Sequence, residues 1–209
     1  MTARRAPLLP SIGPLLALAL AGAALPARGA ALAIAFTDAA GKPLADAVAL
    51  LEPVGVRPAV KPMADVQISQ SQRTFHPRVT LVTVGTRVDF PNFDTVRHHV
   101  YSLSPAKTFE LKLYAGVPSQ PVLFDKPGLA VLGCNIHDRM AAWVVVADTP
   151  WAARSGDDGR ARLDAVPPGG YRLRAWHPAL GPAERGLEQA VTVDAAGTAL
   201  ALKLPVDAP

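Results

Sequence analysis

The sequence contains one cysteine, Cys134, among 209 residues, so it cannot form an internal disulfide. It has no stretch with the pattern of a strong amphipathic helix, while 21 prolines and 16 glycines divide it into short segments. A glycine-rich phosphate loop, a serine nucleophile elbow and a His-Glu-x-x-His motif are all absent from the sequence. The chain therefore lacks the common signatures of hydrolytic and phosphate-binding enzymes, and we expect a protein that is not an enzyme.

A long apolar run occurs only at the N-terminus. Two arginines precede the apolar residues 8–20, and small residues follow them. This order is typical of a secretory signal peptide, and two prolines and a length below the roughly 20 residues of a membrane span count against an anchor. We expect residues 1–30 to be a signal peptide cut between Ala23 and Ala31, and the mature protein to be periplasmic, without a membrane span.

The charge of the chain gives no sign of a nucleic-acid partner. The formal net charge is +4, and loss of Arg4 and Arg5 with the signal peptide lowers it to +2. Loss of Arg28 as well leaves +1. Binding to phosphates along a nucleic acid needs a stronger basic patch, so we expect no nucleic acid.

Export makes the single cysteine informative, because a free thiol in an oxidising compartment is exposed to oxidation. Three interpretations of Cys134 stay open at this point: a buried inert side chain, a metal ligand, or a cysteine that pairs with another chain.

Short runs of β-branched and aromatic residues separated by turn residues predict an all-β fold. They have the spacing of a sandwich or barrel. The expected strands lie at 33–36, 47–51, 66–68, 79–84, 87–90, 98–103, 109–114, 122–124, 130–133, 142–147, 161–163, 171–176, 189–193 and 199–204.

Two motifs at opposite ends of the chain resemble one family. Asp38-x-x-Gly-x-Pro-Leu-x-x-Ala-Val and, later, Asp158-Gly-Arg with Pro167-Pro-Gly-Gly-Tyr-Arg-Leu are similar to the carboxypeptidase regulatory-like, transthyretin-like β-sandwich. We expect residues 31–57 and 149–205 to form this sandwich, with residues 60–148 inserted in it, because the first segment is too short to bury a core alone. Three consecutive modules are the alternative. Insertion predicts that residues 32–51 pair with strands that follow Thr149.

The segment Cys134-Asn-Ile-His137-Asp-Arg-Met140 places a thiolate, an imidazole and a thioether on one loop between two expected strands. Soft sulfur with imidazole suits copper, which must be held both as Cu(I) and as Cu(II). Zinc is disfavoured because structural zinc sites prefer more thiolates, and a dinuclear copper centre would need a second cysteine.

The inserted segment resembles the plastocyanin and amicyanin branch of the cupredoxins. The resemblance rests on the Cys-x2-His-x2-Met loop and on the upstream strand that begins His98-His99-Val100. It implies a Greek-key β-sandwich and one mononuclear type 1 copper bound by His98, Cys134, His137 and Met140. Because His99 replaces the asparagine of the family's His-Asn-Val motif, the choice between His98 and His99 stays open.

The resemblance implies a periplasmic blue copper protein that carries single electrons, with His137 as the exposed electron port. The chain is also similar to bacterial methylamine utilization proteins, which implies a redox partner such as a periplasmic dehydrogenase or a cytochrome. One alternative is a protein for copper storage, delivery or sensing, but carriers of Cu(I) often have exposed methionine clusters and this sequence has only 3 methionines. The other alternative is an interaction module in which copper is incidental or absent and the transthyretin-like sandwich is the working part.

Other residues have less specific expected roles. We expect His76 and His177 to be structural or surface residues, and Trp143 to lie in the core. Asn92 and Asn135 are candidates for hydrogen bonds across the ligand loop.

Overall fold

A computed structural model of the protein describes residues 29–118, 120–181 and 186–207. The expected signal peptide lies almost entirely at residues 1–28, outside the described residues. Among those that are described, no helix is long and apolar enough to cross a membrane. The described residues form seventeen strands and one short 3₁₀ helix, Pro178–Leu180, which confirms the all-β expectation.

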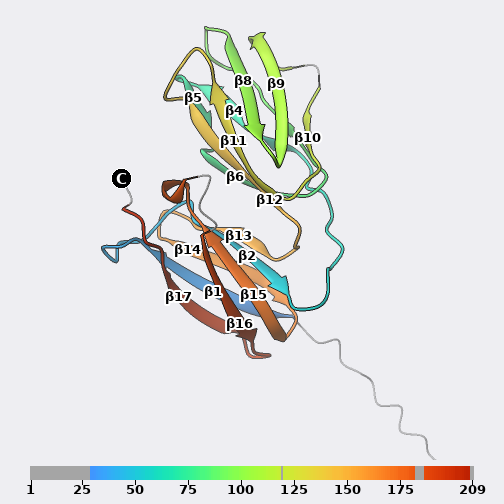
Figure 1. The fold of residues 1–209 in the computed structure, drawn as a ribbon, viewed down its shortest axis with the longest axis vertical. Coiled ribbons are helices and arrows are strands. Elements are labelled where there is room, and N and C mark those ends of the chain that lie inside the picture. The colour runs from blue at the N-terminus through green and yellow to red at the C-terminus, as the bar shows by residue number, and fades with distance from the viewer. Residues whose placement is uncertain (1–28, 119, 182–185, 208–209) are drawn as a thin grey trace, which may run out of the picture.

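The strands form two β-sandwiches that are stacked along the long axis of the molecule (Figure 1). We call the first the outer sandwich; its sheets have the strand orders β14-β1-β17 and β13-β2-β15-β16. Its strands come from both ends of the chain: β1 (Ala30–Thr37), β2 (Val48–Pro53), β13 (Ala152–Arg154), β14 (Arg160–Val166), β15 (Gly169–Trp176), β16 (Leu187–Val193) and β17 (Thr198–Lys203).

The pairing predicted for the first segment is confirmed. In β1, Ile34 lies opposite Ala161 of β14 and next to Leu200 of the parallel strand β17. In β2, Leu51 lies opposite Leu173 of β15. The N-terminal strands thus complete sheets whose other members all follow Thr149.

The second sandwich, the inner sandwich, is built from the middle of the chain. A five-stranded sheet of order β6-β12-β11-β8-β9 packs against a three-stranded sheet of order β10-β7-β3, with the β4–β5 hairpin beside them. The strands are β3 (Val66–Gln67), β4 (Ser69–Ser71), β5 (Thr74–His76), β6 (Val79–Thr83), β7 (Thr86–Asp89), β8 (His98–Ser104), β9 (Lys107–Tyr114), β10 (Val122–Phe124), β11 (Gly128–Cys134) and β12 (Ala141–Ala147).

Aromatic and aliphatic side chains from both sheets fill the inner sandwich. Phe109 packs against Phe90 and Phe124, with ring centroids 5.6 Å and 6.2 Å apart. Cys134 and Met140 belong to the same buried cluster. The expected metal ligands therefore lie at the edge of a well-packed core.

A third apolar cluster joins the two sandwiches. It contains Val48 and Leu50 from β2, together with Val145 and Ala147 from β12. Alternate residues of a strand point to opposite faces, so each of these strands buries one face in its own sandwich and the other face in the contact between sandwiches. This explains why both strands are apolar at successive positions, a pattern typical of strands that are covered on both sides.

Candidate metal centre

Strand alternation decides which of the two adjacent histidines enters the site. His98, the first residue of β8, is 0% exposed, and its Nδ1 lies 3.7 Å from Cys134 Sγ. His99 points to the other face, where its Nε2 is 2.9 Å from Glu110 Oε1 without the alignment of a hydrogen bond. The structure therefore places His98, and not His99, beside the cysteine.

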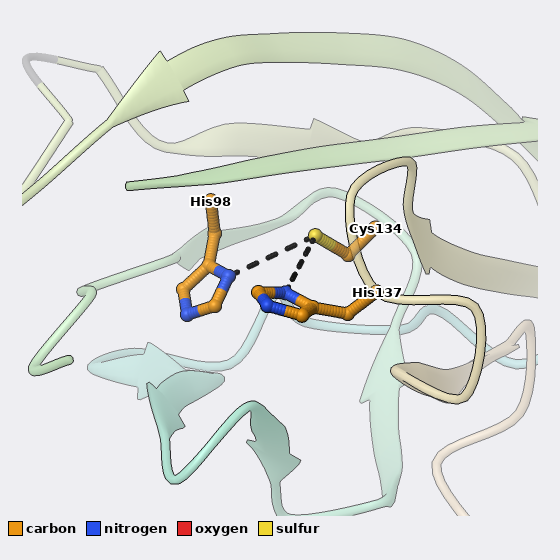
Figure 2. Close-up of side chains that lie close together, drawn as sticks. All are labelled: His98, Cys134 and His137. Carbon is orange, nitrogen blue, oxygen red and sulfur yellow. Dashed lines mark hydrogen bonds between the residues drawn. The ribbon is translucent and has the colours of Figure 1, made fainter. Parts of the chain in front are cut away.

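The ligand loop between β11 and β12 brings the second imidazole back over the thiol. His137 Nδ1 lies 3.8 Å from Cys134 Sγ (Figure 2). The His137 amide donates to Cys134 O at 3.4 Å, and the Met140 amide donates to His137 O at 2.9 Å. These two backbone hydrogen bonds curl the loop, and the His137 ring lies beside His98 at the start of β8, with ring centroids 5.0 Å apart.

Met140 closes the loop and is buried, with 3% of its surface exposed. It lies in the same apolar cluster as Cys134, and both residues line an open groove of about 710 Å³ on the surface of the five-stranded sheet. The structure thus brings Met140 into the surroundings of Cys134.

The arrangement of donor atoms fits a single metal ion. One ligand atom from each of His98, Cys134 and His137 lies within 4.8 Å of the others. Donors bound tetrahedrally, at about 2.0 Å for nitrogen and 2.3 Å for sulfur, are separated by roughly 3.5 Å, which is close to the two sulfur–nitrogen distances of 3.7 Å and 3.8 Å. Two imidazoles and one thiolate with a thioether nearby form a donor set that suits copper.

A carboxylate that the sequence analysis missed lies behind His98. Asp94 Oδ2 is 2.7 Å from His98 Nε2. Partial burial acts to raise the pKa of Asp94, but hydrogen bonds from the Arg73 amide, from His98 and from the Gln72 amide outweigh it, so the pKa is lowered. The only available signal in the sequence was an aspartate four residues before the histidine.

The role expected of Asn92 is wrong. Its side chain donates to Val96 O at 3.0 Å and to Tyr114 O at 2.9 Å, so it bonds within the neighbouring loops and does not reach the ligand loop. A buried side chain satisfies the nearest unpaired carbonyls, and here these belong to its own loop and to the end of β9. Asn135 is exposed on the ligand loop.

A tyrosine supports the floor of the site. Tyr114 donates to Phe90 O at 2.7 Å and accepts a hydrogen bond from the buried Gln70. Burial, and to a smaller extent the nearby Cys134, raises the pKa of Tyr114 to about 12, while the hydrogen bond from Gln70 acts to lower it.

Apolar side chains are exposed on the surface beside the site, and His137 is the expected metal ligand that reaches this surface. His137 is partly exposed on the ligand loop, where its neighbour Ile136 is 45% exposed. Phe93 and Val96, in the loop before β8, are 65% and 39% exposed. A buried His98 and a partly exposed His137 give the site one closed side and one side open to the surface.

The remaining histidines and Trp143 lie away from the site. His76 is exposed, whereas His177 is buried and its Nδ1 accepts from the Ala179 amide at 3.1 Å as the N-cap of the 3₁₀ helix. Trp143 is only half-buried and packs against the apolar contact between the sandwiches, with Arg78 5.1 Å from its ring centroid. The expectation that Trp143 lies in a core is therefore corrected to a position at this contact.

Comparisons with known proteins gave matches among solved structures alone. No family model and no curated protein matches the chain. A Cu-containing nitrite reductase from Thermus scotoductus SA-01 is 27% identical, with 46% of this chain and 25% of that chain covered and a TM-score of 0.37. A purple cupredoxin from Nitrosopumilus maritimus is 22% identical over 39% of this chain and 99% of its own, with a TM-score of 0.35.

An amicyanin variant in its reduced Cu(I) form is 17% identical over 47% of this chain and 97% of its own, with a TM-score of 0.36. The present chain thus spans a quarter of the nitrite reductase and nearly all of the two small proteins. Its own strands and sheet order define an all-β protein built from two β-sandwiches.

Proposed function

We propose that the protein is an exported type 1 copper protein that carries single electrons between redox partners. The observation that carries this proposal is the convergence of His98 Nδ1, Cys134 Sγ and His137 Nδ1 at one end of a packed β-sandwich. Copper would be held by these three atoms, with Met140 as the weak axial ligand, and would supply the one-electron step between Cu(I) and Cu(II).

The protein's own residues favour transfer of electrons over catalysis. His98 is fully buried, and Cys134 and Met140 are almost fully buried. Together with His137 they would supply four donors to the metal and leave no open coordination position for a substrate. A rigid, packed site suits a metal that must change charge without rearrangement of its ligands. His137 is the ligand nearest to solvent and would serve as the port through which an electron passes to a partner.

The location of the protein and the identity of the outer sandwich belong to the same proposal. The N-terminal pattern supports export to the periplasm, and the two divided motifs support a transthyretin-like outer sandwich. A periplasmic dehydrogenase or a cytochrome fits as a partner, because both deliver or accept single electrons.

The test is visible absorption during copper addition to the metal-free protein. We expect an intense thiolate-to-copper band in the wild type and its loss in Cys134→Ser, since a hydroxyl cannot supply the covalent thiolate bond. The proposal fails if the wild type gains no such band, or if the serine variant keeps it. Release of copper on reduction of the wild type would instead indicate delivery of the metal.

A further inference from the structure

The two ring nitrogens of His98 have different partners on opposite sides of the ring. Nδ1 faces Cys134 Sγ at 3.7 Å, and Nε2 lies 2.7 Å from Asp94 Oδ2. The imidazole is 0% exposed and the Asp94 side chain 15% exposed, so water competes little for this pair. A carboxylate oxygen accepts hydrogen bonds, so Nε2 is the donor to Asp94, and the ring is turned with Nδ1 toward Cys134.

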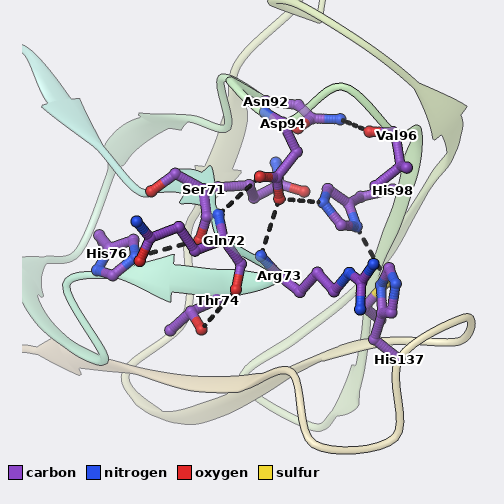
Figure 3. A network of polar contacts seen from close by, with 12 residues as sticks. Ser71, Gln72, Arg73, Thr74, His76, Asn92, Asp94, Val96, His98 and His137 are labelled. Atoms are coloured by element: carbon purple, nitrogen blue, oxygen red, sulfur yellow. Dashed lines mark hydrogen bonds and ion pairs between the residues drawn. The ribbon is translucent and has the colours of Figure 1, made fainter.

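Asp94 is itself held by the turn of the β4–β5 hairpin. The Gln72 amide donates to Asp94 Oδ1 at 2.6 Å, and the Arg73 amide donates to Oδ2 at 2.9 Å (Figure 3). Gln72 and Arg73 have φ values of 52° and 59°. The left-handed region costs a residue with a side chain roughly 1–2 kcal/mol, so this turn adopts a costly backbone that points two amides at the carboxylate.

The loop that carries Asp94 is fixed from its other side by Asn92. Asn92 Oδ1 accepts from the Asp94 amide at 3.0 Å, and its side-chain amide donates to Val96 O at 3.0 Å. Every bond that orients the Asp94 carboxylate thus comes from a backbone amide or from His98, and none depends on a long mobile side chain.

We propose that Asp94 is a positioning residue, clamped by the β4–β5 turn, that fixes the His98 ring with Nδ1 facing Cys134 before any metal arrives, and whose negative charge favours the oxidised metal. The second half of this proposal rests on the proposed function, whereas the first half concerns the metal-free chain alone. A carboxylate behind a ligating histidine orients the ring and raises its basicity, and its removal typically costs 10–100-fold in metal affinity.

The decisive variant is Asp94→Asn. An amide has one acceptor oxygen for the three donors from Gln72, Arg73 and His98, so the clamp loses both its charge and its pattern of hydrogen bonds. The affinity for Cu(II) should fall about 10- to 100-fold. The affinity for Cu(I) should fall less, because the lower charge of Cu(I) gains less from a nearby carboxylate. The reduction potential should then rise by about 59 mV for each tenfold difference between the two losses.

Asp138→Asn is the matched control, because it removes the same charge from an exposed position on the ligand loop. Cu(II) and Cu(I) titrations and the reduction potential are compared among wild type, Asp94→Asn, Asp94→Glu and Asp138→Asn. The proposal predicts a large change in Asp94→Asn, partial recovery in Asp94→Glu and a clearly smaller change in Asp138→Asn. Equal changes in Asp94→Asn and Asp138→Asn would overturn it.

A second measurement needs neither copper nor a variant. Nitrogen NMR of the imidazoles in the metal-free wild type should show that His98 Nε2 carries a proton that is hydrogen-bonded to a carboxylate. An Nε2 without a proton would overturn the clamp, even where Asp94→Asn fails to fold. A wild type that shows the expected Nε2 proton but binds no copper would contradict the proposed function and leave the clamp supported.

Discussion

The close approach between Gly133 and Tyr101 gives a prediction whose sign depends on the background in which it is tested. Gly133, which directly precedes Cys134 in β11, lies opposite Tyr101 in β8. A Cβ added at Gly133 would meet Tyr101 Cζ at 2.9 Å, Oη at 3.0 Å and Cε1 at 3.2 Å. The first distance is shorter than real Cβ contacts allow, so the tyrosine ring must move.

Two opposing effects determine the magnitude for Gly133→Ala. Overpacking costs about 1–3 kcal/mol, and we take the lower half because Tyr101 is partly exposed and can turn outward. Alanine in place of glycine within a strand gains about 0.5–1 kcal/mol through lower chain entropy in the unfolded state. The free energy of unfolding should therefore fall by up to about 1.5 kcal/mol in the wild-type background. With Tyr101→Ala the ring is gone, and the same substitution should stabilise the protein by about 0.5–1 kcal/mol.

Urea unfolding of the metal-free protein in a double-mutant cycle measures this difference directly. The four proteins are wild type, both single variants and the double variant. A coupling of about 1 kcal/mol or more with the stated sign would support the packing of Tyr101 on Gly133. An effect of Gly133→Ala that is the same in both backgrounds would refute the reasoning.

Three further predictions concern the site and its surface. Met140→Leu should retain copper in both oxidation states and raise the reduction potential, since loss of the thioether withdraws a donor that supports Cu(II). A reductive titration in which bound copper is measured checks this prediction, and a lowered reduction potential would contradict it. The pKa of Tyr114 is raised to about 12, so its contribution to stability is complete below the unfolded value near 10 and is lost as pH rises through about 12. Thermal unfolding between about pH 10 and 12 should therefore show a steeper loss of stability in wild type than in Tyr114→Phe, and equal slopes would count against it. Arg73 in the β4–β5 turn, Arg97 before His98 and Arg139 on the ligand loop are exposed and form no ion pair within the described residues. Their positive charges should attract anionic hexacyanoferrate(III), and because salt screens this attraction, oxidation of the protein should slow as the salt concentration rises. Replacement of all three by glutamate should reverse this dependence, and the same reversal after replacement of three basic residues on the outer sandwich would show that net charge alone is responsible.

The ligand loop and most strands could be predicted because their signals are local. Cys134, His137 and Met140 stand within one loop, and β-branched runs mark the strands on either side. The choice of His98 over His99 needed the structure, because alternation along a strand shows that the two differ in face but not which face is buried.

Apart from the pairing of residues 32–51 with the strands after Thr149, contacts between distant segments could not be predicted. The β4–β5 hairpin has polar strands and no glycine or asparagine in its turn, so neither periodicity nor turn chemistry indicates it. The partners of Asp94 at Gln72 and Arg73 come from this unrecognised hairpin. The contact between sandwiches was missed for a related reason: an apolar run such as 48–51 indicates burial but does not say that two different cores cover it.

The double burial of β12 has a consequence for how the protein can change over generations. Val144 and Val146 face the sandwich with the metal ligands, whereas Val145 and Ala147 face its neighbour. Because both faces of β12 are buried, a substitution at any of these four positions changes the packing of one apolar cluster. It must be compensated by a second substitution in the sandwich that it contacts. We therefore expect the two sandwiches to evolve together. Recombination that replaced only one of them would leave a mismatched apolar contact at β12, the strand that follows Met140.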